Sequence, residues 1–79
     1  MSISIGDYVF VTTEKEQRGF VKYIGEVKGV KGSFIGIELD TPTGKNDGTA
    51  KGDRYFDCKI NHGLFVKEGG VTVITVKKN

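Results

Sequence analysis

The stretch Phe34-Ile35-Gly36-Ile37-Glu38-Leu39 decides the fold class of this chain of 79 residues. Successive side chains of a β-strand point to opposite faces of a sheet. Every second residue of the stretch is a large aliphatic one, and these form one face: Ile35, Ile37 and Leu39. The residues between them form the other face: Phe34, Gly36 and Glu38. The pattern predicts a β-strand with one face in the core and with Phe34 on the opposite face.

Five other short runs also have the composition of β-strands, because they are rich in β-branched and aromatic residues and lie between turn-forming residues. These runs are Tyr8–Val11, Phe20–Ile24, Tyr55–Ile60, Leu64–Val66 and Val71–Val76. In the third run, alternation predicts an apolar face made of Phe56, Cys58 and Ile60. The side chains of Tyr55, Asp57 and Lys59 are then expected outside.

Two of the predicted strands place a phenylalanine opposite the core. In residues 64–67, Leu64 and Val66 point one way, whereas Phe65 and Lys67 point the other. Together with Phe34, they suggest a groove that is both aromatic and basic. A second minor core or a covering loop remains the alternative for these phenylalanines.

Glycine is the unusual residue type of this chain. The sequence has 12 glycines, roughly twice the average usage, and they are scattered between the apolar runs. This distribution predicts many turns and leaves no long helical pattern. Five or six short strands are expected to curl into a small barrel or a tight sandwich, as a single domain over residues 5–76. Residues 1–4 and 77–79 are expected to be loose ends.

Composition narrows the functional classes. With 37% hydrophobic and 28% charged residues, the chain is predicted to be a folded globular domain. No apolar run approaches the roughly 20 residues of a membrane span. The segment Met1–Tyr8 lacks the basic and apolar regions of a signal peptide. We therefore expect no membrane partner.

The charge distribution slightly favours an acidic partner. The net charge is +2, which is too small to be a footprint for nucleic acid. Residues 1–40 carry five Lys or Arg against six Asp or Glu, a balance of −1, and residues 41–79 carry seven against four, a balance of +3. Acidic residues separate the basic ones in the second half, which argues against nucleic-acid binding.

The candidate catalytic groups are few, since the chain has one His and one Cys. The segment around Lys45 is not a phosphate-binding Walker A loop, because Leu39 stands where the first glycine belongs and Asn46 replaces Ser or Thr. Cys58 and His62 are four residues apart, but Cys58 lies on the predicted core face, which disfavours a thiolate pair. A single cysteine also favours a reducing, cytosolic setting. We expect a binding module that is not an enzyme and has no metal or cofactor.

The segment Gly44-Lys45-Asn46-Asp47-Gly48-Thr49 is the most polar turn of the chain. Asn, Asp and Gly tolerate left-handed backbone conformations, and such turns can gather several N–H groups into an anion-binding nest. The side chains of Lys45 and Asn46 would add donors for a carboxylate. An ordinary hairpin turn with solvated side chains is the alternative, and spacing alone favours it.

Three motifs together resemble the CAP-Gly domain, a glycine-rich module of cytoskeleton-associated proteins. They are Gly44-Lys45-Asn46-Asp47-Gly48, Gly52-Asp53-Arg54-Tyr55-Phe56 and Gly63-Leu64-Phe65-Val66. The resemblance continues upstream through residues 18–25 and 36–40 and covers roughly residues 5–75. It implies a small, highly twisted, mostly antiparallel SH3-like β-barrel.

The resemblance also implies a function. CAP-Gly domains bind acidic C-terminal tails of the Glu-Glu-Tyr or Glu-Glu-Phe type, as on α-tubulin and on microtubule end-binding proteins, and some bind zinc knuckles of microtubule-tip linkers. By position, Lys45 and Asn46 match residues that contact the tail, and Phe34, Phe65 and Lys67 match the groove lining. Arg54 and His62 match positions that frame the groove.

Two positions depart from the family pattern. The family has an aromatic residue a few positions before a tryptophan, and this chain has Gly29 and Phe34 there. The slot thus loses one ring and has a smaller second ring. The resemblance leaves two hypotheses open: a cytoplasmic microtubule adaptor or tip-tracking module, and the corresponding domain of a tubulin-folding cofactor that acts as a chaperone in tubulin heterodimer assembly.

Overall fold

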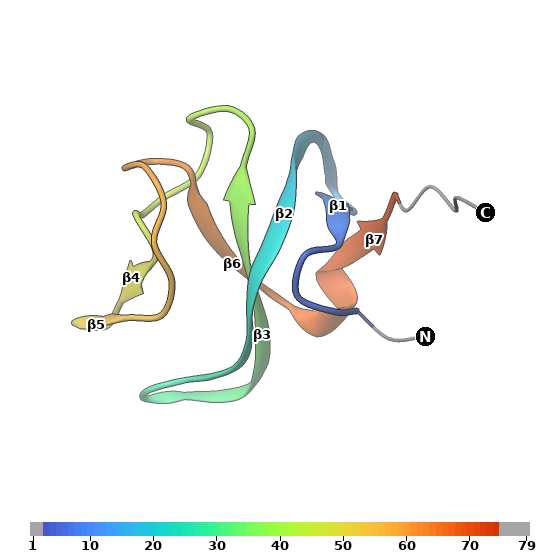
Figure 1. Ribbon diagram of the computed structural model, residues 1–79. Helices are drawn as coiled ribbons and strands as arrows, with labels where there is room; N and C mark the ends of the chain where they lie inside the picture. The colour runs from blue at the N-terminus through green and yellow to red at the C-terminus, as the bar shows by residue number, and fades with distance from the viewer. Residues whose placement is uncertain (1–2, 75–79) are drawn as a thin grey trace.

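The computed structural model describes residues 3–74, and β-strands are their main regular structure. The strands are β1 (Tyr8–Val11), β2 (Glu14–Val27), β3 (Val30–Leu39), β4 (Thr49–Ala50), β5 (Asp53–Arg54), β6 (Gly63–Lys67) and β7 (Val71–Val73). A single 3₁₀ turn, η1 (Glu68–Gly70), links β6 to β7. Five strands form one antiparallel sheet in the order β6-β3-β2-β1-β7, and β4 pairs with β5 in a separate two-stranded sheet (Figure 1). The predicted all-β, antiparallel fold class is confirmed.

The long hairpin of β2 and β3 forms the centre of the sheet (Figure 1). Its turn lies at Lys28 and Gly29, where Gly29 has φ +81°, a conformation that favours glycine. Farther along the hairpin the register shifts, so that Val21 pairs with Ile37 whereas Tyr23 pairs with Gly36. Lys22 is therefore the extra residue of a β-bulge. The bulge moves Tyr23 to the sheet face that carries Gly36.

The core lies on the inner face of the large sheet. It consists of seven buried side chains: Val9, Val11, Val21, Ile35, Ile37, Leu39 and Leu64. Ile35 and Ile37 are 0% exposed and Leu39 is 2% exposed, which confirms the face predicted from alternation in residues 34–39. Val66 is half-buried and packs against this core, as its predicted orientation requires.

The large sheet is open, so the expected SH3-like barrel is not closed. Strands β6 and β7 form its two edges and do not pair with each other within residues 3–74. The turn η1 redirects the chain after Lys67, so that β7 crosses the molecule and pairs with β1.

The prediction of a strand over Tyr55–Ile60 is also wrong. The strand β5 ends at Arg54, and the next residues follow an irregular path. The N–H groups of Tyr55 and Phe56 both donate to the carbonyl of Gly48, so this backbone does not join a ladder. Without a strand, alternation does not hold: Phe56 is buried, Cys58 is half-buried, and Ile60 is 73% exposed.

The ends of the chain lie mostly outside the described residues. Strand β7 begins at Val71, as predicted, and ends at Val73, while residues 75–76 of that predicted strand are outside the described part. Residues 77–79 are also outside it. Within residues 3–74, no helix has the length and apolar composition that a bilayer-crossing segment needs.

Candidate functional site

Four aromatic rings cover the outer face of the sheet, opposite the core. They belong to Tyr23, Tyr55, Phe56 and Phe65. The ring centroids of Tyr23 and Tyr55 are 5.0 Å apart, those of Tyr55 and Phe65 are 5.7 Å apart, and those of Phe56 and Phe65 are 5.5 Å apart. Such tilted and edge-on contacts are favourable for aromatic pairs. We call these four residues the aromatic cluster.

The aromatic cluster depends on Gly36 of β3. Tyr23 and Phe65 are the cross-strand partners of Gly36 on its two sides. A Cβ atom at this position would lie 2.6 Å from Cε1 of Phe56 and 3.1 Å from Cε1 of Phe65. The missing side chain therefore makes room for the rings directly above the strand.

The β2–β3 hairpin holds the phenol groups of the cluster. The hydroxyl of Tyr23 donates to the carbonyl of Glu26 at 2.6 Å. The N–H of Lys28 donates to the hydroxyl of Tyr55 at 2.8 Å. Each of these bonds orients a ring whose apolar body faces the cluster.

The loop Gly44–Gly48 is fastened to the start of β6, at one end of the cluster. The N–H groups of Lys45 and Asn46 donate to the carbonyl of Gly63 at 2.8 and 3.1 Å, and the N–H of Gly63 donates to the carbonyl of Asn46 at 2.8 Å. The N–H of Gly48 donates to Oδ1 of Asn46 at 2.9 Å. The N–H groups of Lys45, Asn46 and Gly48 therefore do not form an anion-binding nest, the less favoured of the two sequence interpretations, since they bond within the protein. The loop is also not a hairpin turn, because it connects β3 to β4.

The donors that this loop offers to a ligand are side chains. Lys45 is exposed, and it takes part in no ion pair among residues 3–74. Asn46 uses Oδ1 for Gly48, while its Nδ2 has no hydrogen-bond partner within the described part of the chain. A cationic amine and an amide donor lie on adjacent residues, and this combination suits a carboxylate.

Arg54 holds the loop from the side of β5. Its guanidinium group forms ion pairs with Asp47 at 3.3 Å and with Asp57 at 3.1 Å, and it also donates to the carbonyl of Asp47. A hydrogen bond from Thr49 and the nearby charge of Arg54 lower the pKa of Asp47. Arg54 thus frames the loop, but its charge is already compensated.

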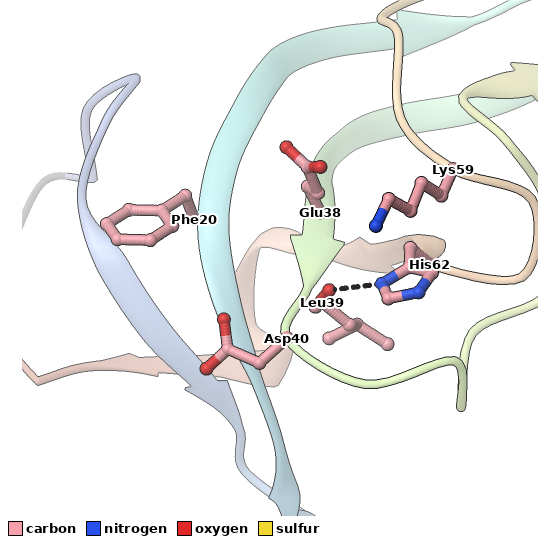
Figure 2. Close-up of a pocket in the computed structure, with 6 residues that line it drawn as sticks. All are labelled: Phe20, Glu38, Leu39, Asp40, Lys59 and His62. Carbon is pink, nitrogen blue, oxygen red and sulfur yellow. Dashed lines mark hydrogen bonds between the residues drawn. The ribbon is translucent and has the colours of Figure 1, made fainter.

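His62 lies beside a different hollow of about 330 Å³, which Figure 2 shows. The other residues around this hollow are Phe20, Glu38, Leu39, Asp40 and Lys59. The Nδ1 atom of His62 lies 2.7 Å from the carbonyl oxygen of Leu39, at the end of β3 (Figure 2). Neither Lys45 nor any ring of the aromatic cluster lines this hollow, so His62 is not grouped with the other predicted site residues.

Phe34 and Lys67 lie at the opposite end of the cluster, where they form a cross-strand pair of β3 and β6. The ammonium group of Lys67 is 5.2 Å from the centroid of the Phe34 ring, a distance typical of a cation–π contact. Phe34 is half-buried, whereas its neighbour Ile35 is fully buried.

Five of the predicted site residues lie along β6: Lys45 and Asn46 beside its start, Phe65 within it, and Lys67 at its end, paired with Phe34. We call the strip that they form the groove. The sequence interpretation missed Tyr23 and Tyr55 as parts of its wall. Tyr23 was missed because uninterrupted alternation puts it on the face of Val21, and the bulge at Lys22 reverses that assignment. Tyr55 was assigned only to an outer strand face. The sequence carries no local signal for either arrangement.

The geometry does not assemble a thiolate pair. The Cys58 thiol donates to the carbonyl of Lys59, and the ring of His62 bonds to Leu39. Burial raises the pKa of the Cys58 thiol, which disfavours the thiolate.

Comparisons with known proteins agree with the fold. Residues 5–71 match the CAP-Gly domain family. The solved CAP-Gly domain of human kinesin-like protein KIF13B is 36% identical, with a TM-score of 0.84 over 94% of this chain and 72% of that chain. The CAP-Gly domain of Bik1, solved with an ETF peptide from Bim1, is 36% identical, with a TM-score of 0.69 over 80% of this chain and 75% of that chain.

Curated relatives contain a similar segment as part of longer chains. Tubulin-specific chaperone B of Dictyostelium discoideum is 42% identical over 78 residues, which cover 92% of this chain and 29% of that protein. This chain spans less than a third of the length of each of eight curated relatives, including dynactin subunit 1 of Xenopus laevis. Since the family match covers most of the sequence, the chain belongs to the CAP-Gly domain family.

Proposed function

We propose that this chain is a microtubule-associated binding module that recognises acidic C-terminal tails ending in an aromatic residue. The expected tails are of the Glu-Glu-Tyr or Glu-Glu-Phe type, on α-tubulin or on end-binding proteins, with zinc-knuckle linkers as further partners. The related Bik1 domain was solved with an ETF peptide from Bim1, which contains both an acidic and an aromatic residue. This function places the chain on microtubules in the cytoplasm.

One structural observation carries the proposal: two lysines that form no ion pair among residues 3–74 lie at opposite ends of a row of aromatic rings. Lys45 projects from the loop that bonds to Gly63, and Lys67 lies over Phe34. Phe65 and the rest of the aromatic cluster lie between them. A terminal carboxylate at Lys45 and Asn46, an aromatic ring at Phe65 and an acidic side chain at Lys67 would each meet a complementary group.

The proposed role is binding, without catalysis. The thiol of Cys58 and the imidazole of His62 are engaged with backbone carbonyls, as described above. Neither group lies in the groove. The groove residues supply donors, positive charge and apolar surface, which are the properties of a recognition site.

Calorimetric titration with a Glu-Glu-Tyr peptide tests this proposal. Lys45→Ala combined with Asn46→Asp should weaken binding by about 2–4 kcal/mol, since it removes two donors and adds a negative charge. Asp retains an oxygen for the N–H of Gly48, so the thermal midpoint should stay within a few degrees. Asn46→Ala would instead leave that N–H without its partner.

A C-terminally amidated peptide is the matched control, because it removes the carboxylate without changing the protein. Equal affinity for the free acid and the amide would contradict the assignment of Lys45 and Asn46. Absence of binding to any acidic-aromatic peptide would contradict the proposed function as a whole.

A second candidate function is that of the CAP-Gly domain in a tubulin-folding cofactor, with a chaperone role in heterodimer assembly. The match to tubulin-specific chaperone B covers 92% of this chain, which favours this candidate. The two functions differ in what the longer protein does with tubulin. If adding the full-length protein dissociates purified tubulin heterodimers, it acts as a cofactor; if it only accumulates on assembled microtubules, it acts as an adaptor.

A further inference from the structure

Strand β7 forms one edge of the large sheet, and it is less protected than the other edge, β6. Edge strands of native proteins are usually shielded from other chains by charged side chains, by proline or by a covering loop. At β6, the Gly44–Gly48 loop bonds to Gly63, and Lys67 places a charge at the end of the strand. In the described part of the chain, β7 pairs only with β1 (Figure 1). Its sequence, Val71-Thr72-Val73, has neither a charge nor a proline.

The hydrogen bonds to β1 show which main-chain groups of β7 face the free edge. The N–H of Thr12 donates to the carbonyl of Gly70 at 2.9 Å, and the N–H of Ile74 donates to the carbonyl of Tyr8 at 2.8 Å. Successive residues of an antiparallel strand bond alternately to its two sides, so Thr72 also belongs to the ladder with β1. The residues on either side of Thr72 therefore direct main-chain groups away from β1.

The free edge of β7 is complementary to itself. The carbonyl of Val71 and the N–H of Val73 face this edge, one residue before and one residue after Thr72. If a second copy of β7 approaches in the antiparallel direction with Thr72 opposite Thr72, each Val73 N–H meets the Val71 carbonyl of the other copy. A hollow of about 440 Å³, lined by Ile3, Glu68, Gly69 and Val71, adjoins the start of the strand. Within residues 3–74, no segment fills this space.

The side chains of β7 also suit a second copy. Val71 and Val73 are half-buried and pack against the core, whereas Thr72 is exposed on the opposite face. In the register centred on Thr72, Val71 lies opposite Val73 of the other copy, and the two threonines lie opposite each other. Directly opposite residues of a strand pair share a face, so valine meets valine and hydroxyl meets hydroxyl. Pairs of this kind stabilise antiparallel strands.

We propose that two copies of this chain associate through β7, as an antiparallel strand pair centred on Thr72. The large sheets of the two copies then join into one continuous sheet. Association stops at two copies, because the pairing uses the same edge of both and is closed by two-fold symmetry. The paired stretch is short, so the association is weak and depends on protein concentration. The grooves lie along β6, at the opposite edge of each sheet, and stay open in the pair.

A charge swap at Thr72 tests this proposal, since the residue lies opposite its own copy. In sedimentation equilibrium, the mass of the native chain should rise from one copy toward two as the concentration increases from roughly 10 μM to 1 mM. Thr72→Lys and Thr72→Glu each place like charges opposite one another, and each should weaken association about fivefold or more. An equimolar mixture of the two variants should regain at least the native association, because lysine then lies opposite glutamate.

Thr12→Val is the matched control. The hydroxyl of Thr12 lies 3.1 Å from that of Thr72, so this variant removes the contact without adding a charge, and it should associate like the native chain. Thermal melts check that every variant is folded. A native chain that stays single over the whole concentration range would overturn the proposal. So would association that persists in both separate Thr72 variants, or a mixture that does not recover, since another surface would then join the copies.

Discussion

The two faces of β3 are stabilised by different kinds of interaction. The inner face consists of Ile35, Ile37 and Leu39, which are almost completely shielded from solvent. The outer face consists of Phe34, Gly36 and Glu38, and groups from distant parts of the chain cover it unevenly. The hydrophobic effect explains why the aliphatic side chains of the inner face are buried. It is non-directional, so these side chains need no particular partner. The outer face needs specific partners, and therefore it holds the candidate site.

The largest expected effect is a loss of stability caused by a substitution on the inner face of β3. Ile37→Ala removes a fully buried side chain and should reduce the free energy of unfolding by about 2–5 kcal/mol. Urea denaturation followed by tyrosine fluorescence measures the loss. The folded fraction should bind tail peptide with native affinity, because Ile37 points away from the groove. A loss below 0.5 kcal/mol would mean that the core relaxes around the missing atoms.

A smaller effect should come from the centre of the outer face. Gly36→Ala places a Cβ atom 2.6 Å from the Phe56 ring, so the aromatic cluster must open. We expect a loss of about 1–3 kcal/mol in stability, as in other overpacked sites. In contrast to Ile37→Ala, this variant should also weaken binding of the Glu-Glu-Tyr peptide in the folded protein. Native affinity in Gly36→Ala would show that the cluster is only a minor core.

Phe34 lies at the end of the outer face, and its removal should affect binding more than folding. Phe34→Ala should destabilise the protein by less than the roughly 3–5 kcal/mol of a fully buried phenylalanine. It should weaken tail binding about tenfold, since Lys67 also loses the ring that positions it. Thermal melts and calorimetry of the same samples separate the two quantities.

Phe34→Trp is the companion variant. Phe34 is only half-buried, so part of a larger ring can extend into solvent. The indole should be tolerated and should tighten binding by about 0.5–1.5 kcal/mol through added ring contact. If Phe34→Ala unfolds the domain while the indole is not accommodated, Phe34 belongs to the core and the groove is misplaced.

The smallest expected effect concerns salt. Arg54 is compensated by two aspartates, so that Lys45 and Lys67 are the groove cations left for an acidic tail. Affinity should decrease only modestly between low and physiological ionic strength. Titrations at several salt concentrations give the slope. A steep slope, of the kind that phosphate contacts produce, would indicate a nucleic-acid ligand instead.

Alternation predicts a side-chain orientation only while the strand remains regular. It correctly assigned both faces of residues 34–39, which lie in the middle of the sheet and pair on both sides. It could not have placed Tyr23 correctly, because the bulge at Lys22 changes the phase of β2. It failed for residues 55–60, because their backbone bonds to Gly48 and not to a neighbouring strand.

For the motif residues too, the local sequence predicts some features, whereas others depend on contacts with distant parts of the chain. Sequence alone identified Gly44–Gly48 as a polar turn and as one of the motifs that resemble the family. It did not reveal that the N–H groups of Lys45 and Asn46 bond to Gly63, which lies 17 residues beyond Asn46 in the sequence. Likewise, Arg54 and His62 were assigned to one rim, but Arg54 bonds to the loop and His62 lines another hollow.

By itself, the sequence determined the all-β class, the inner face of the central strand and the family of the chain, because alternation, glycine spacing and motif residues are local properties. Only the tertiary structure decided that the sheet is open, that the aromatic cluster includes Tyr23 and Tyr55, and that Lys67 keeps a free charge while Arg54 does not. These features depend on which residues meet across long stretches of chain. These long-range contacts depend on how the whole domain packs, so no single segment of the sequence determines them.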